Sequence, residues 1–296
     1  MSSRRRPIHR STPVSRALTG ALVSVLAVAA IALAVFALTP RTPPDTGPLR
    51  TTAPSIAPPA SSSPSPSPTA SSSSPPIAPV AAPGAQERFL AVGAQAMWRA
   101  SAGDCGTVAP LLERSTDGGQ TWSDVTPRYL GIGEILHVES FVGTEARIVA
   151  RVGDTCETQG LRTFTQGRFW EQDAATLAAA TYVDPAAASV IVTPSGRIEA
   201  PCPAPWGAQG DDGALTIVCD GVAQHWDGGS WQVVADRAVA AVWTTDGART
   251  ARTDASCAGL LVGDTCLADA PAGPAALATS ADTLWLWAGD TVRALP

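Results

Sequence analysis

The chain has 296 residues, 45% of them hydrophobic, and a formal net charge of −6. Residues 1–86 carry seven Arg and one Asp, whereas residues 87–296 carry 13 Arg and 25 acidic residues, a net charge of −12. This negative charge repels phosphate and therefore excludes nucleic acid as a partner of residues 87–296. All 20 basic residues are Arg, which excludes Lys-dependent chemistry such as a Schiff base.

An uncharged apolar segment follows the basic N-terminus. Residues 17–38 contain no charged side chain, and 22 residues of α-helix span about 33 Å, enough for a bilayer core of about 30 Å. Five Arg precede the segment, so the positive-inside rule makes residues 1–16 a cytoplasmic basic tail. The alternative is a cleaved secretory signal, whose apolar region normally has about 7–15 residues. We therefore expect a single-pass transmembrane helix, with the cell membrane as location and the remaining chain outside.

Residues 39–86 form the next compositional segment and are rich in Pro and Ser. Within 39–84, 14 Pro and 10 Ser occupy 24 of 46 positions. Pro lacks a backbone donor and Ser buries little apolar surface, so no core is expected there. The segment is predicted to be a disordered linker that holds the following domain away from the membrane.

From Glu87 to the end of the chain, the pattern indicates an all-β domain. Short runs of Val, Leu, Ile, Ala and Trp alternate with Gly- and Asp-rich turns about every 8–12 residues. Residues 174–180 are the one stretch with helical character, and a strand entering a loop is the alternative there. The domain is expected to be extracellular, with a β-sandwich, barrel or propeller as its architecture.

One octet is built like a tight β-hairpin turn. It consists of Ser115, Thr116, Asp117, Gly118, Gly119, Gln120, Thr121 and Trp122. Asp117 is expected to accept hydrogen bonds from N–H groups of its own turn, and the two Gly residues permit positive φ. Trp122 supplies a large ring to bury between strands.

The octet fits the Asp-box pattern S/T-x-D-x-G-x-T-W, so the chain resembles the Asp-box (BNR) repeat proteins. In that family the box is structural and recurs once per blade of a β-propeller, and the family includes sialidases and non-enzymatic propellers. Weaker copies occur at 163–170, at 226–231 and at 244–251. At about 40–50 residues per blade, the 210 exported residues predict about five blades, and the uneven spacing of the weaker copies leaves four or six as alternatives. A β-sandwich is the alternative fold. The terminal segment 276–295 is expected to pair with the strands near Phe89 and close the ring.

All six Cys lie in the exported part, which indicates disulfides. Among the fifteen possible connectivities we favour three pairs: Cys105–Cys156, Cys202–Cys219 and Cys257–Cys266. The last two pairs are local in sequence, and Cys105 and Cys156 each follow a Gly-Asp turn at corresponding places in neighbouring repeats. No metal site and no cofactor are expected, because no C-x-x-C pair occurs and the exported part has two His.

Catalytic candidates are sparse. A sialidase-like site needs clustered Arg, a Tyr with a partnering Glu and an acidic residue, and the chain has two Tyr, Tyr129 and Tyr182. His137 and His225 are the His residues of the exported part, and no G-x-S-x-G elbow accompanies them. Of the nine Trp, those in the repeat hairpins (Trp122, Trp170 and Trp231) are expected in the core, whereas Trp206, between Pro205 and Gly207, is the candidate for an exposed ligand platform.

The function predicted from these observations is non-catalytic binding or scaffolding by a membrane-anchored propeller. A wall glycan or an extracytoplasmic protein is the expected partner. The alternative is a glycan hydrolase of sialidase-like architecture.

Overall fold

The chain folds into six antiparallel β-sheets, which we call blades 1 to 6 in chain order. The computed structural model describes residues 80–211 and 214–295. Blade 1 contains β1 (Arg88–Val92), β2 (Met97–Ser101), β3 (Leu111–Ser115) and β4 (Ser123–Asp124). Blade 2 contains β5 (Ile132–Ser140), β6 (Ala146–Val152), β7 (Glu157–Thr163) and β8 (Glu171–Gln172). Blade 3 contains β9 (Tyr182–Val183), β10 (Val190–Thr193) and β11 (Gly196–Glu199).

Blades 4 to 6 continue the same pattern. Blade 4 contains β12 (Trp206–Asp211), β13 (Ala214–Cys219), β14 (Val222–Trp226) and β15 (Trp231–Asp236). Blade 5 contains β16 (Ala238–Thr244), β17 (Gly247–Asp254), β18 (Cys257–Val262) and β19 (Thr265–Leu267). Blade 6 contains β20 (Ala275–Ser280), β21 (Thr283–Ala288) and β22 (Thr291–Leu295). Within residues 80–211 and 214–295, three short helical elements lie outside the sheets: η1 (Gly84–Gln86), η2 (Arg128–Leu130) and α2 (Ala174–Ala179).

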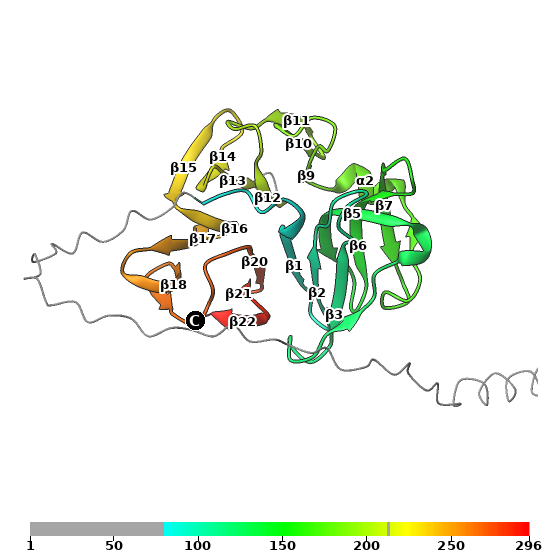
Figure 1. Cartoon of the computed structure of the whole chain (residues 1–296), viewed down its shortest axis with the longest axis horizontal. Coiled ribbons are helices and arrows are strands. Elements are labelled where there is room, and N and C mark those ends of the chain that lie inside the picture. The colour runs from blue at the N-terminus through cyan, green and yellow to red at the C-terminus, as the bar shows by residue number, and fades with distance from the viewer. Residues whose placement is uncertain (1–79, 212–213, 296) are drawn as a thin grey trace, which may run out of the picture. The chain divides into compact units, whose positions relative to one another are not determined.

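The blades are arranged as a closed ring, with the first strand of each blade nearest the axis (Figure 1). Inner strands contact the next blade all the way round, and β1 of blade 1 packs against β20 of blade 6. This is a six-bladed β-propeller, so the predicted propeller fold is confirmed and the sandwich alternative is excluded. The expected count of about five is wrong, because blades 3 and 6 have three strands and need fewer residues than four-stranded blades.

Ring closure differs from the expected strand pairing. Strands β1 to β4 form a complete sheet from consecutive strands, as do β20 to β22, and no hydrogen-bonded pair joins the two sheets within the described residues. Side chains connect them instead. Arg88 Nη1 donates to Gly289 O at 2.8 Å, and its guanidinium lies 4.5 Å from the centroid of a Trp287 ring. Arg99 lies over Trp122 and Trp287, so two arginines join the first and last blades.

The core lies between neighbouring blades. Residues Ala238–Val242 of β16 and Ala275–Ala278 of β20 are all buried, because these inner strands are covered on both faces. Strands buried on both faces read as continuous apolar runs rather than alternating patterns. Ala and Val at these positions let adjacent blades approach closely near the axis.

Three disulfides are present, and they are the pairs that the sequence favoured. Cys105–Cys156, Cys202–Cys219 and Cys257–Cys266 have Cα–Cα distances of 6.2, 5.7 and 5.5 Å. The first joins the β2–β3 connection of blade 1 to the β6–β7 connection of blade 2, which are corresponding positions in the two blades. It therefore connects two neighbouring blades at the same end of the ring.

The octet forms the turn between β3 and β4, the third and fourth strands of blade 1. Asp117 Oδ1 accepts from the N–H groups of Gln120 and Thr121 at 3.0 and 2.9 Å, as predicted. Gly118 and Gly119 have φ of 71° and 85°. In the corresponding turn of blade 2, Thr165 Oγ1 accepts from Phe169 N–H, so a hydroxyl takes the place of the carboxylate.

The weaker copies do not all occupy this turn. The copy at 226–231 lies between the third and fourth strands of blade 4, where Asp227 accepts from Gly229 and Ser230 N–H. The copy at 244–251 is different, because Thr244 and Gly247 lie in the turn between the first and second strands of blade 5. Residues Ala174–Ala179 form a helix that begins after Asp173, whose side chain accepts from Thr176 N–H.

The N-terminal boundary of the folded unit precedes Glu87. Val80 packs against two buried clusters, one formed by blades 4 and 5 and the other by blades 5 and 6. Helix η1 follows within the segment that the sequence assigned to the linker. The predicted tail at 1–16, the transmembrane segment at 17–38 and the linker up to residue 79 lie outside the described residues. Within the part of the chain that is described, no helix has the length and apolarity to cross a membrane.

Candidate binding cavities along the ring axis

The larger of two axial cavities lies at the C-terminal ends of the inner strands and has a volume of about 1230 Å³. It is lined by Leu90–Val92 of β1, Glu139 and Ser140 of β5, Gln209 of β12, and Val242 to Thr244 of β16. The inner strand of blade 6 contributes Ala278 and Thr279. Because the inner strands of different blades meet here, the ring itself builds this cavity.

The lining of the larger cavity is strongly polar. Its hydroxyl groups come from Ser140 and six threonines: Thr181, Thr244, Thr245, Thr265, Thr279 and Thr283. Its charged residues are four acids and two arginines, a net charge of −2 among the described lining residues: Glu139, Asp246, Asp264, Asp282, Arg147 and Arg249. Such a surface suits a polar ligand that offers both donors and acceptors.

His137 lines this cavity and has a lowered pKa. Burial lowers its pKa from 6.5 to about 4, against an opposing backbone hydrogen bond to Thr181. The imidazole is therefore neutral at pH 7 and adds no charge to the cavity.

One aromatic ring is exposed in the larger cavity. Trp243, near the end of β16, is 37% exposed and lies in the cavity wall. Its ring stacks on His225 of blade 4 with the centroids 3.5 Å apart. Trp243 follows the buried apolar run Ala238–Val242, and the sequence predicted no role for it.

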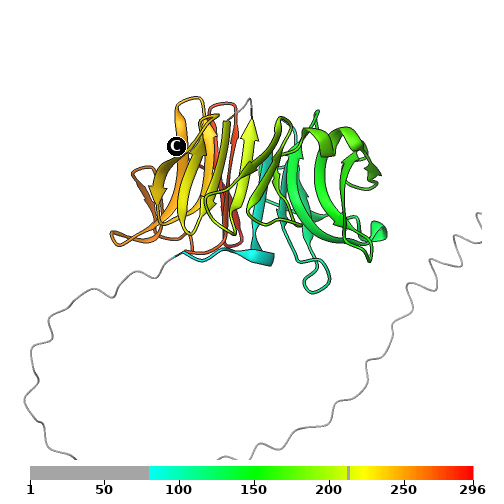
Figure 2. The same ribbon diagram turned by 90° about the horizontal axis from the view of Figure 1, so that it is seen from above.

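The smaller cavity lies at the opposite, N-terminal ends of the inner strands and has a volume of about 370 Å³. Residues 82–85, at the start of the described chain, form part of its wall, and Figure 2 shows this segment running along one end of the strands. Phe89 and Ala208 line both cavities. The two cavities therefore adjoin the same two inner-strand residues, and the N-terminal segment forms part of the wall of the smaller one.

Glu87 anchors this N-terminal segment inside the smaller cavity. Its Oε1 accepts from Gly207 N–H of β12 at 2.7 Å, and its backbone O accepts from Ala102 N–H at 2.8 Å. Burial raises the pKa of Glu87 to about 7, the Gly207 hydrogen bond opposes this, and the nearby charge of Glu134 adds to the increase. Glu87 thus changes charge near neutral pH.

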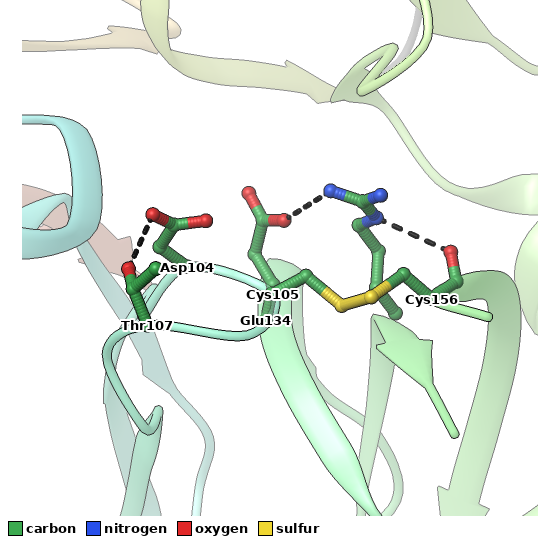
Figure 3. The surroundings of a disulfide bond; sticks show 6 residues. Asp104, Cys105, Thr107, Glu134 and Cys156 are labelled. Atoms are coloured by element: carbon green, nitrogen blue, oxygen red, sulfur yellow. Dashed lines mark hydrogen bonds and ion pairs between the residues drawn. A yellow bond between two sulfur atoms is a disulfide. The ribbon is translucent and has the colours of Figure 1, made fainter. Parts of the chain in front are cut away.

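The rest of this wall is held by an ion pair and a disulfide (Figure 3). Arg151 Nη1 lies 2.9 Å from Glu134 Oε2, and Arg151 Nε donates to Cys156 O at 3.2 Å. Cys156 is bonded to Cys105, which follows Asp104, another residue of the cavity wall. The disulfide thereby fixes the loop that positions Asp104 relative to the Glu134–Arg151 pair.

Trp206 does not form the exposed platform that the sequence predicted. It is 4% exposed, and its indole N–H donates to Val239 O of blade 5 at 3.1 Å. The neighbouring Pro205 and Gly207 indicated a loop, but the ring is enclosed by blades 4 and 5 and contributes to the wall of the smaller cavity.

The other predicted site residues lie away from the cavities or serve the fold. None of the described cavity-lining residues belongs to the octet, whose Trp122 packs with Trp287 and Val292 of blade 6. Hydrogen bonds from Thr121, Ser115 and Gln120 lower the pKa of Asp117 to about 2. This carboxylate acts as a fixed acceptor for its own turn.

The constellation that a sialidase-like enzyme needs is not assembled among the described lining residues of either cavity. Tyr129 is exposed, and its hydroxyl donates to Trp170 O of blade 2 at 3.1 Å. Tyr182 is buried in β9. Neither Tyr lies in the wall of either of these two cavities. Among the described residues, no group of three or more His, Cys, Asp or Glu is arranged to hold a metal ion.

No family model and no curated protein sequence matches the chain. Among solved structures it is similar to YCF48 bound to D1 peptide, with 14% identity, a TM-score of 0.36, and coverage of 69% of this chain and 75% of that one. YCF48 from Cyanidioschyzon merolae gives 16% identity, a TM-score of 0.28 and coverage of 70% and 68%. The chain is also similar to the six-bladed Aleuria aurantia lectin, described by its fucose recognition, with 12% identity and a TM-score of 0.40. That match covers 71% of this chain and 94% of the lectin chain. The six-bladed architecture of this chain is established by its own strand pairing.

Proposed function

We propose that this chain is a membrane-anchored, extracytoplasmic β-propeller that binds an external ligand without transforming it. The ligand class is a wall glycan or a segment of a protein partner. The observation that carries the proposal is the larger axial cavity, which is lined by hydroxyl, carboxylate and guanidinium groups from several blades. The complete octet at 115–122 supports placing the chain among the Asp-box proteins.

The ring supplies the rigidity that binding requires. Each blade packs on its neighbours, and three disulfides restrict the connections between and within blades. Lining groups on rigid strands lose little conformational entropy when a ligand is bound. The anchor at 17–38 and the linker at 39–79 complete the proposal, because they would display this cavity outside the membrane.

The test is to block the larger cavity and measure binding. Thr279 lies on β20, is exposed, and lines the cavity, so Thr279→Trp places an indole in the ligand space without disturbing the core. Val233→Trp is the matched control, since Val233 is exposed on β15, the outer strand of blade 4.

Purified, oxidised full-length chain would be titrated with soluble cell-wall fragments and a glycan panel, and its co-purifying proteins would be identified. Ligand retained by the Val233→Trp variant and lost by the Thr279→Trp variant supports the proposal. Equal binding by the two variants and the wild type refutes it.

A further inference from the structure

Strand β15 is the outermost strand of blade 4 and lies at the periphery of the ring (Figure 1). It has six residues, whereas the outermost strands of the other four-stranded blades, β4, β8 and β19, have two, two and three. The three-stranded blades end on strands that carry charge: β11 contains Arg197 and Glu199, and β22 contains Arg293. Short or charged outer strands protect a sheet against the addition of another strand. Strand β15 has neither protection, because its first five residues are uncharged.

Half of the backbone groups of β15 point away from the blade. In an antiparallel ladder, successive residues of a strand bond alternately to one side and to the other. Asp227 N–H donates to Ser230 O at 3.2 Å across the preceding turn, so Ser230 and then Gln232 bond to β14. The N–H and C=O groups of Trp231 and Val233 therefore face the open edge. Among the described residues, no hydrogen bond joins these groups to another element.

The side chains of β15 also suit strand pairing. Val233 and Val234 occupy its two central positions, and Val233 is 69% exposed. Uncharged segments of high β-propensity without Pro are the type that adds to another strand. The strand is held in place, since Trp231 Nε1 donates to Glu199 O of blade 3 at 2.8 Å, and Val234 packs against buried residues of blades 4 and 5. The edge is therefore preformed for a partner.

We infer that β15 pairs antiparallel with β15 of a second copy of this chain, so that one sheet continues across a dimer of two propellers. A two-fold axis places the same edge of each copy against the other, and antiparallel pairing of a strand with itself has this symmetry. The inference goes beyond the proposed function, because it concerns assembly of the ring and not its cavities.

The position of charge on the strand fits this arrangement. Asp236, the charged residue of β15, lies at one end of the strand. Pairing centred on Val233 and Val234 puts each Asp236 beside the Trp231 end of the other copy. The two carboxylates are then about 17 Å apart along the strands, at about 3.4 Å per residue, which exceeds the Debye length of about 8 Å at physiological ionic strength. Antiparallel pairing therefore avoids repulsion between like charges.

The chain's own linker is a poorer occupant of this edge. Within residues 39–84, 14 positions are Pro, which has no N–H to donate to a ladder. A six-residue edge is also a small contact, so the dimer is expected to depend on concentration. The membrane anchor proposed for 17–38 would favour it by concentrating copies in one membrane.

The test is sedimentation equilibrium of the oxidised full-length chain in detergent over a series of concentrations. Val233→Lys places a charge at the open edge, and Val233→Pro removes an outward N–H, while neither removes a hydrogen bond to β14. Each variant is expected to weaken dimerisation about tenfold or more. Ala294→Lys is the matched control, since Ala294 is exposed on β22, the outermost strand of blade 6. Unchanged melting temperatures would show that the variant rings are intact.

Residue-resolved hydrogen exchange locates the contact. The amides of Trp231 and Val233 should gain protection as the concentration of wild type rises, whereas the amide of Gln232 is protected throughout. A wild type that stays monomeric at every concentration overturns the inference. A dimer that survives in both Val233 variants and leaves the Trp231 and Val233 amides unprotected overturns β15 as the contact. Protection of these amides by a co-purifying protein on a monomeric chain overturns the second copy as the occupant.

Discussion

The pH dependence of the free energy of unfolding tests how strongly burial in the ring raises the pKa of Glu87. Its pKa is about 7 in the folded chain, against an ordinary value of 4.5, mainly because burial disfavours the charged form. Each pKa unit corresponds to about 1.4 kcal/mol, so complete ionisation reduces the free energy of unfolding by about 3 kcal/mol. The folded state binds the proton more tightly than the unfolded state. The stabilisation is therefore complete below pH 4.5 and is lost as the pH rises through 7.

Glu87→Gln removes the ionisation but keeps the contact, because the amide oxygen still accepts from Gly207 N–H. We expect the variant to match the wild type at pH 4.5 and to exceed its free energy of unfolding by up to about 3 kcal/mol at pH 8.5. Urea denaturation followed by Trp fluorescence at a series of pH values measures the difference.

The control Glu157→Gln removes one charge at an exposed position of β7, so the general effect of net charge can be subtracted. A difference between Glu87→Gln and wild type that does not grow with pH, or a variant that is less stable at pH 8.5, would refute the reasoning. Such a result would mean that the N-terminal segment leaves the cavity and exposes Glu87 to water.

Four further predictions concern other parts of the chain. The wild type should lose about 3 kcal/mol of its free energy of unfolding as the pH falls from 6.5 to 4, because His137 binds a proton less tightly in the folded than in the unfolded state. The His137→Gln variant should not show this loss, and denaturation at pH 4 and 7 measures the difference. Asp117→Ala should lower the melting temperature by removing acceptors for Gln120 and Thr121 N–H while ligand binding stays unchanged, and a loss of binding in folded protein would contradict its structural role. Replacing both Cys105 and Cys156 by Ala should lower the free energy of unfolding by about 2–4 kcal/mol, and thiol labelling of the wild type should find no free cysteine in the folded ring. Cell fractionation should recover the full-length chain in the membrane, whereas a soluble product that begins near residue 38 would show that 17–38 is a cleaved signal.

Features that depend on neighbours in sequence were predictable from the sequence. The Asp117 turn is one example, because every hydrogen bond that defines it joins residues within four positions. The disulfide pairs are another, since Cys257 and Cys266 are local and Cys105 and Cys156 occupy corresponding turns of adjacent blades. The all-β class followed in the same way from short apolar runs and regular turns.

Blade number was not predictable to the same degree, because it depends on how many strands each sheet recruits. Blades 3 and 6 stop at three strands, whereas blade 5 forms a fourth strand without an Asp-box turn before it, so the motif does not report the number of strands in a blade. Closure also departed from the expected pairing, since Arg88 and Arg99 join blades 1 and 6 through contacts with Trp287 about 190 to 200 residues away. Nothing in the local sequence around either arginine indicates that partner.

The chemistry of the axis was decided by tertiary structure alone. Trp206 was expected to be exposed but is buried, because burial depends on which blade covers each ring: its N–H donates to Val239 O of the neighbouring blade. Glu87 titrates near neutral pH because ring closure brings it to Gly207, 120 residues further along the chain. The local sequence determined turns, disulfides and strand type, whereas desolvation and ligand-facing exposure were set by contacts between distant blades, which a linear pattern does not contain.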